Sequence, residues 1–239
     1  MDNLLSELDS VTFDFVMSVG PACRPAQQLK HADLRTTAAP MDWMELYPLS
    51  TVVHLFRTGF SDFFMEIEDI TGPELRKNRR VVDTKNNITS IHHFPSDKSL
   101  EAGQKAMRKT MVRRYQRIHQ MFRRGKRFCF VCNRPDSPEA LLQFMTDFRT
   151  VYPQGEFWMM NVRSVDDNIF YVNQHKKNGL YLYDISFQDV HPDGADISTN
   201  PLTWHGNTPR WQEVLCHIHL SPAAHKQAEK KWWRLFRRN

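Results

Sequence analysis

The sequence predicts an α/β fold, in which a central, mainly parallel sheet is flanked by helices. Two observations lead to this prediction. Short apolar runs typical of buried strands alternate with longer segments whose apolar residues recur at helical spacing. The chain of 239 residues is also long enough to build one substantial core. We therefore assign residues 1–224 to a single domain, and residues 225–239 to a C-terminal tail that is expected to extend it as a helix.

The composition is that of a soluble globular protein, with 41% hydrophobic and 25% charged residues. No run of about 18 apolar residues is visible, and residues 1–7 are acidic and lack the basic and hydrophobic parts of a signal peptide. The four cysteines are unevenly spaced, with two of them in one apolar run, which does not suggest a disulfide framework. We therefore expect a cytoplasmic, reduced protein.

The first predicted strand, residues 13–19, is followed by a turn at Gly20-Pro21 and then by Cys23. Pro25 suits the first position of a helix, so Cys23 would lie between a strand and a helix. Helix N-terminal amides and the helix dipole stabilise a thiolate there, and the amides can bind the oxyanion that forms when the thiolate attacks a carbonyl. Cys23 is therefore the candidate nucleophile. The alternative is a buried, inert cysteine.

A hairpin is predicted by residues 81–83 and 88–94, with its turn at residues 86–87. On the second strand, His92 and His93 would point to opposite faces, so only one of them would face a given site. A histidine is the expected base for a thiol because its pKa lies near neutral pH.

Three segments predict helices. Residues 46–64 indicate one helix, or two that break near Gly59, and residues 138–150 indicate another. The longest helix is predicted over residues 99–125.

The long helix lies in a strongly basic segment. From Lys105 to Arg127 there are ten Lys or Arg residues and no acidic residue. Arg113, Arg114 and Arg117 are therefore the candidates for binding phosphates or other anions, while a solvated helix face is the alternative. Coenzyme A would be such a ligand. Nucleic acid is not an expected partner, because no nucleic-acid-binding motif accompanies the charge.

The remaining apolar runs predict strands at residues 127–133, 157–162, 169–173 and 180–186, and a helix or strand at residues 208–216.

The first of these strands contains a C-x-x-C motif, Cys129 and Cys132. Residues three apart on a strand point to opposite faces, so we expect no metal site there. A zinc site that adds Cys216, His217 and His219 is the alternative.

Acidic candidates for orienting a catalytic histidine occur at two places. Asp42 lies between large apolar residues, where a carboxylate is either structural or positions an active-site group. Asp189 and His191 lie in a late polar loop, which by analogy of fold completes the triad in hydrolases whose nucleophile ends the first strand. His191, oriented by Asp189, is therefore the alternative to His92.

Four short motifs carry a resemblance to a known family. They are Ser18-Val19-Gly20 with Cys23, Gln28-Leu29-Lys30, Pro40-Met41-Asp42-Trp43 and Ile91-His92-His93-Phe94. With the basic helix and the strand that follows it, they resemble a bacterial family of uncharacterised proteins described as papain-like cysteine peptidases. The resemblance covers residues 12–165 and implies that His92 is the catalytic histidine. Met41 replaces the family's phenylalanine, and His93 stands where the family usually has aspartate.

The C-terminal tail combines basic and aromatic residues at helical spacing. They are Lys230, Lys231, Trp232, Trp233, Arg234, Phe236 and Arg237. Such a segment suits the surface of an anionic membrane and would make the protein peripheral to the inner membrane, whereas docking of the aromatic side chains on the core is the alternative.

Together these features predict a cysteine-dependent acyl-transfer enzyme that works through a Cys23 thioester, as a papain-like hydrolase or peptidase or as an acyltransferase. Cys23 would be the nucleophile, His92 the base and Asp42 the candidate orienter, acting on a peptide, amide or other acyl donor without a required cofactor. The alternative is a non-catalytic or membrane-peripheral protein of surface polysaccharide assembly, which binds phosphorylated ligands through its basic helix and tail.

Overall fold

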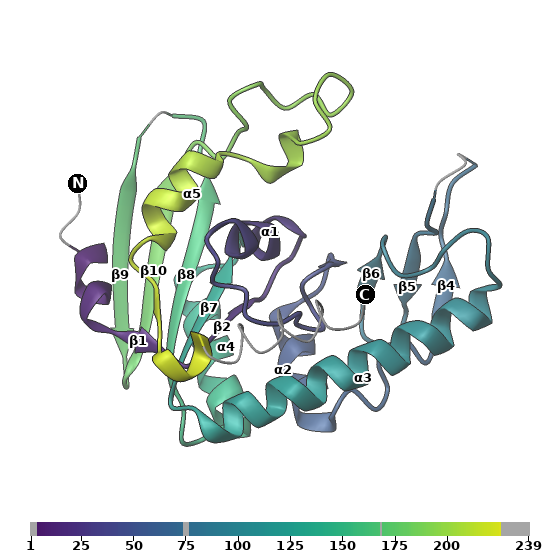
Figure 1. Cartoon of the computed structure of the whole chain (residues 1–239), viewed down its shortest axis with the longest axis horizontal. Coiled ribbons are helices and arrows are strands. Elements are labelled where there is room, and N and C mark those ends of the chain that lie inside the picture. Colours follow the sequence, from purple (N-terminus) through teal and green to yellow (C-terminus); the bar gives the residue numbers. More distant parts are fainter. Residues whose placement is uncertain (1–3, 74–76, 168, 226–239) are drawn as a thin grey trace.

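The computed structural model describes residues 4–73, 77–167 and 169–225, and it confirms the predicted α/β fold. Its main sheet has five strands in the order β2-β7-β8-β10-β9 (Figure 1). The first four of these are parallel, and β9 pairs antiparallel with β10 at one edge. The strands are β2 (Phe15–Ser18), β7 (Arg127–Cys132), β8 (Glu156–Ser164), β9 (Tyr171–Lys177) and β10 (Leu180–Phe187).

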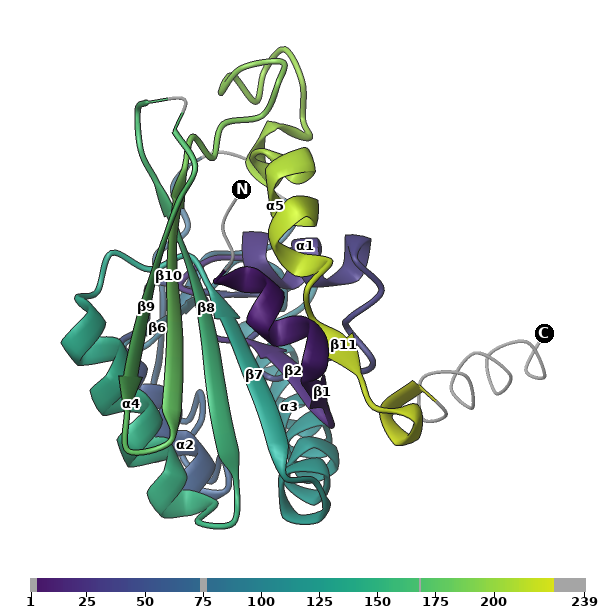
Figure 2. The ribbon, with the colours of Figure 1, turned by 90° about the vertical axis from the view of Figure 1, so that its left-hand side faces the viewer.

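Alternate residues of the main sheet face two different cores, because successive side chains of a strand point to opposite faces. Met17 and Phe130 belong to one core, and their chain neighbours Val16 and Val131 belong to the other. Helices cover both faces of the main sheet, which gives three layers (Figure 2). The first core lies under α2 (Leu49–Thr58), α3 (Leu100–Arg124) and α4 (Pro138–Val151), and the second under the short 3-10 helix η1 (Leu5–Ser10), α1 (Arg24–His31) and α5 (Thr208–Leu215).

The ends of the predicted helices follow ordinary capping rules. The Ser99 side chain accepts a hydrogen bond from the Ala102 amide at the start of α3, and the helix ends before Gly125. Residues 46–64 contain one helix, α2, which stops where Gly59 adopts φ +68°. In Figure 1, α3 runs from the foot of the main sheet to a second, smaller sheet.

The second sheet is inserted between β2 and β7. It has four antiparallel strands in the order β3-β6-β5-β4. They are β3 (Met44–Glu45), β4 (Ile67–Asp69), β5 (Val81–Asp83) and β6 (Ile88–Ser90). The predicted hairpin is thus present, with Asn87 at φ +53° in its turn. However, β6 ends at Ser90, so His92 and His93 lie in the bend after the strand and not on it as predicted.

Short elements complete the described chain. Strands β1 (Thr12–Phe13) and β11 (His219–Leu220) form a parallel pair, and Thr203–His205 form the 3-10 helix η2. None of the helices in the described ranges is both long and apolar enough to cross a membrane. The basic and aromatic residues 230–237 lie outside the described residues, so the predicted membrane contact of the tail stays a prediction.

Candidate active site

Cys23 lies on the turn between β2 and α1. The Val19 amide donates a hydrogen bond to Val131 O of β7, at 3.0 Å, and this bond extends the sheet by one residue beyond β2. The chain then turns through Gly20, which has φ +45°. A larger residue does not fit there, because its Cβ would collide with the Tyr47 hydroxyl. Cys23 occupies the N-cap position of α1. Its side chain makes no capping hydrogen bond, so the thiol is free for another partner.

That partner is His92. The Cys23 Sγ and His92 Nε2 atoms are 3.4 Å apart, although the residues are 69 positions apart in the sequence. Cys23 is 8% exposed, whereas His92 is exposed to solvent. The main sheet supplies the thiol and the second sheet supplies the imidazole, which lies two residues beyond β6. This arrangement pairs a nucleophile with a base within hydrogen-bonding reach.

The surroundings of this Cys23–His92 pair favour its uncharged form. Burial, together with the Glu45 and Asp42 carboxylates, raises the pKa of the Cys23 thiol to about 12. Burial lowers the pKa of His92, although Glu45 opposes that change. Burial and the two carboxylates therefore act against the thiolate that the sequence leads us to expect at this helix N-terminus. At neutral pH the pair is a thiol beside a neutral imidazole.

Glu45 is the carboxylate that acts on both members of the pair, and sequence reasoning missed it. It lies on β3, opposite Thr89 of β6. Since His92 follows three residues after Thr89, this pairing brings the Glu45 strand beside the segment that carries the histidine. A strand of two residues leaves no alternation that a sequence pattern could detect.

Asp42, the predicted orienter, has a different set of partners. Its Oδ1 accepts a hydrogen bond from Ser18 Oγ at 2.8 Å, and its Oδ2 accepts bonds from the Arg35 guanidinium and the Ala39 amide. The carboxylate is 2% exposed and anchors the 35–42 loop to the end of β2. Among the described residues His92 is not one of its hydrogen-bond partners, so Asp42 does not orient the imidazole by direct contact.

The alternative pair, Asp189 and His191, does not form. Asp189 accepts hydrogen bonds from Arg24 Nη1 at 2.8 Å and from Trp211 Nε1 at 3.0 Å, which ties the start of α1 to α5. His191 instead faces Asp193, with 3.7 Å between Nδ1 and Oδ2. His92 is therefore the histidine that the structure brings to Cys23.

Two tryptophans lie beside the Cys23–His92 pair. The Trp43 ring packs edge-on against the His92 ring, with 5.8 Å between centroids. Trp204 packs edge-on against Trp43 at 6.4 Å. Both tryptophans are partly exposed. Trp43 therefore lines the site and is not buried in the core, as its apolar neighbours in the sequence would suggest. Trp204 comes from a distant loop, which no local pattern connects with Cys23.

The three predicted anion-binding arginines do not form one cluster. Arg117 Nη1 donates to Thr37 Oγ1 at 2.6 Å, and Arg114 Nη1 lies 3.5 Å from Ala39 O, so both face the 35–42 loop. Arg113 lines a separate cavity with Arg108, Lys109, Thr110, Val112 and Gln116.

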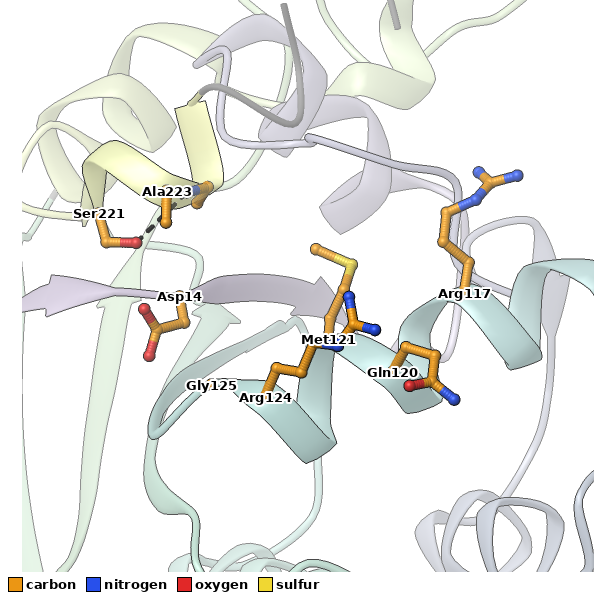
Figure 3. Close-up of a pocket in the computed structure, with 9 residues that line it drawn as sticks. Asp14, Arg117, Gln120, Met121, Arg124, Gly125, Ser221 and Ala223 are labelled. Atoms are coloured by element: carbon orange, nitrogen blue, oxygen red, sulfur yellow. Dashed lines mark hydrogen bonds between the residues drawn. The ribbon is translucent and has the colours of Figure 1, made fainter. Parts of the chain in front are cut away.

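Arg117 also lines a cavity of about 440 Å³ together with Arg124 and Asp14 (Figure 3). Ser221 and Ala223 form its opposite wall.

The C-x-x-C cysteines point to opposite faces of β7 as expected. Cys129 belongs to the core under η1, α1 and α5, and Cys132 to the core under α2, α3 and α4. The histidines of the alternative zinc site, His217 and His219, both contact Asp9 Oδ1, at 2.9 and 3.3 Å. Over residues 4–73, 77–167 and 169–225 there is no group of three or more potential ligands that could hold a metal ion.

Comparison with known proteins identifies a family for this chain. The family described as "Putative papain-like cysteine peptidase (DUF1796)" matches residues 14–151, a segment that contains Cys23, Glu45 and His92. The "Uncharacterized protein R408" of Acanthamoeba polyphaga mimivirus is 23% identical over 132 residues, and the match covers 48% of this chain and 59% of that protein. The chain therefore spans less than two thirds of the length of this relative. No solved structure matches the chain.

Proposed function

Because the chain belongs to the family of papain-like cysteine peptidases, we propose that it is a cysteine-dependent acyl-transfer enzyme in which Cys23 is the nucleophile and His92 the base. The observation that carries the proposal is the 3.4 Å contact between Cys23 Sγ and His92 Nε2. A buried cysteine with a purely structural role has no need of an exposed imidazole at this distance.

The uncharged state of the pair determines the first step. As Cys23 Sγ bonds to the substrate carbonyl carbon, His92 Nε2 takes the thiol proton and becomes an imidazolium. The carbonyl oxygen becomes an oxyanion, for which the backbone amides of residues 22–24, beside the start of α1, are the candidate donors. The imidazolium then gives its proton to the leaving group, and a Cys23 thioester remains.

The second step restores the thiol. An acceptor attacks the thioester carbonyl, His92 takes the acceptor's proton, and the carbon–sulfur bond breaks as Cys23 regains a proton from the imidazolium. With water as the acceptor the enzyme is a peptidase or amidase, and with a sugar or amine it is an acyltransferase.

An anionic acyl donor such as an acyl thioester of coenzyme A suits the basic cavity of Figure 3. Arg117 and Arg124 line it from one face of α3, and paired guanidinium groups bind phosphates well. This cofactor belongs to the acyltransferase form of the proposal, since hydrolysis needs none.

The test is the pH dependence of iodoacetamide labelling at each cysteine, followed by mass spectrometry of the native protein and of His92→Ala. We expect His92→Ala to slow Cys23 labelling at pH 7.5 by about a hundredfold, the usual contribution of a positioned base, and to leave Cys216 unchanged. His93→Ala is the matched control, because the neighbouring His93 contacts Ser90 instead, at 2.9 Å. Equal labelling of Cys23 in the native protein and in His92→Ala would contradict the proposal.

A further inference from the structure

Another cavity is lined by Arg24, the residue that follows Cys23, and by Trp204. It has a volume of about 280 Å³ and is formed by the loop between β10 and α5, together with the first residue of α1. Its walls include Arg24, Asp189, Val190, His191, Ile197 and Trp204. In Figure 1 this loop stands above α1, at the same end of the main sheet as the turn that carries Cys23.

Two contacts connect this cavity with the reacting atoms. Arg24 is the residue that follows Cys23, and its Nε donates a hydrogen bond to Trp204 O at 2.8 Å. The Trp204 ring in turn contacts Trp43, whose ring packs against His92. A group attached to the carbonyl that Cys23 attacks therefore has this cavity within reach, with Trp204 as the shared wall.

The charged groups of the cavity wall are already paired. Arg24 Nη1 and Asp189 Oδ2 form an ion pair at 2.8 Å, and the Asp189 side chain is 2% exposed. His191, the remaining titratable group of the wall, faces Asp193. A charged ligand would find its counter-charges occupied, whereas an uncharged ligand leaves these pairs intact.

Apart from the buried Thr203, the rest of the wall is apolar, and several of its side chains are open to solvent. Ile197 is 62% exposed and Val190 is 39% exposed, and both line the cavity beside the partly exposed Trp204 ring. Neighbouring apolar side chains that remain in water gain free energy when an apolar ligand covers them. Pockets that bind small molecules combine such walls with a few polar groups and start near this volume.

We propose that this cavity binds the aliphatic part of the acyl group that is transferred to Cys23. The inference rests on the proposed function and adds the substrate class: acyl donors with an uncharged aliphatic chain or side chain next to the reacting carbonyl. Trp204 and Ile197 are the residues that select it.

The test compares the labelling of Cys23 by iodoacetamide and by N-hexyl iodoacetamide, with the exposed Cys216 as the reference thiol in the same molecule. We expect the hexyl group to accelerate labelling at Cys23, relative to Cys216, by about tenfold or more, since burying two methylene groups at about 0.8 kcal/mol each gives that gain. Ile197→Asp removes the gain. Ile70→Asp, on another exposed isoleucine outside the cavity wall, is the matched control and retains it.

A binding measurement separates this inference from the proposed function. Heptanamide, whose aliphatic chain is attached to the carbonyl carbon, is titrated against the protein, with a saturable change in tryptophan fluorescence as the readout. Binding is expected in native protein and in Cys23→Ala but not in Ile197→Asp. If Cys23 fails to react with iodoacetamide through His92, the proposed function fails, and this titration still decides the role of the cavity. If Cys23 reacts but the hexyl group gives no gain, or the gain survives Ile197→Asp, the cavity does not bind the acyl group.

Discussion

Glu45 acts on both members of the Cys23–His92 pair, but it favours the uncharged form of the thiol and the charged form of the imidazole. Its negative charge disfavours the thiolate and favours the imidazolium, so it raises the pKa of both Cys23 and His92. Burial also raises the pKa of the thiol, but it lowers the pKa of the imidazole. The net result is a base that is free to accept a proton at neutral pH and a thiol that loses its proton only as it reacts.

Replacing Glu45 with glutamine tests this assignment through the pH profile of Cys23 labelling. In the native protein we expect the rate to fall as the pH drops through the lowered pKa of His92, below about 6.5, because the protonated imidazole cannot accept a proton. Without the carboxylate the imidazolium loses a favourable interaction, so Glu45→Gln moves this acidic limb to lower pH. The alkaline limb, which reports the thiol, also moves to lower pH.

Glu68→Gln is the control, because Glu68 is an exposed carboxylate on β4 of the same sheet. Both limbs should stay in place in this variant. A shift of either limb to higher pH in Glu45→Gln would show that the carboxylate does not act on the pair as described.

Single residues were predictable from sequence where one short motif carried the chemistry. Cys23 follows a strand and precedes a helix, and His92 belongs to a motif that resembles one of a known family, so both could be selected. Glu45 and Trp204 could not, since each reaches the site through tertiary packing of segments that look ordinary. Asp42 was selected because a buried carboxylate needs partners, but those partners are Ser18, Arg35 and Ala39.

Arg134, which follows β7, adds a buried side-chain connection between the end of this strand and the Cys23 turn. It is 5% exposed, and its guanidinium donates hydrogen bonds to Val19 O at 3.1 Å and Tyr47 O at 2.7 Å. Val19 precedes the turn that carries Cys23, and Tyr47 follows β3. Arg134 therefore fixes the end of β2 relative to the strand that carries Glu45.

Arg134→Met is expected to lower the free energy of unfolding by about 3 kcal/mol, because two carbonyl groups lose charged hydrogen-bond donors inside the protein. It should also slow the His92-dependent labelling of Cys23, since the turn is no longer fixed. Urea denaturation and the labelling rate measure the two effects. Arg127→Met, at the start of β7, removes only an exposed ion pair with Glu156 and should change stability by less than about 1 kcal/mol. Similar losses in both variants would rule out a special role for Arg134.

Elements with a long periodic pattern were correctly predicted, and short ones were not. α3 has its cap at Ser99 and its end at Gly125 because propensity and apolar spacing agree over 25 residues. Strands β1, β3 and β11 contain two residues each, so alternation cannot reveal them. The hairpin of β5 and β6 was found from its turn, but its second strand stops early, which places His92 in a bend where it reaches Cys23.

At the scale of the whole molecule, the candidate site depends on how two sheets are held together. The main sheet carries Cys23, the inserted antiparallel sheet leads to His92, and α3 packs its buried face into the core that both share. The assignment of residues 1–224 to one domain predicts that this core and the core on the other face of the main sheet unfold together. Residues from both cores alternate along β7, so one strand can report on both.

Cys129 and Cys132 supply that report, because they lie on the same strand and face different cores. Burial raises the pKa of both thiols, so neither should react in the native protein. In a series of urea concentrations with pulsed iodoacetamide, a single cooperative domain exposes both cysteines at one midpoint, whereas Cys216 reacts throughout. Two separate midpoints would show that the cores unfold independently. The His92-dependent labelling of Cys23 would then be lost at the urea concentration at which Cys132 becomes exposed, because the core of Cys132 contains the residues of the inserted sheet.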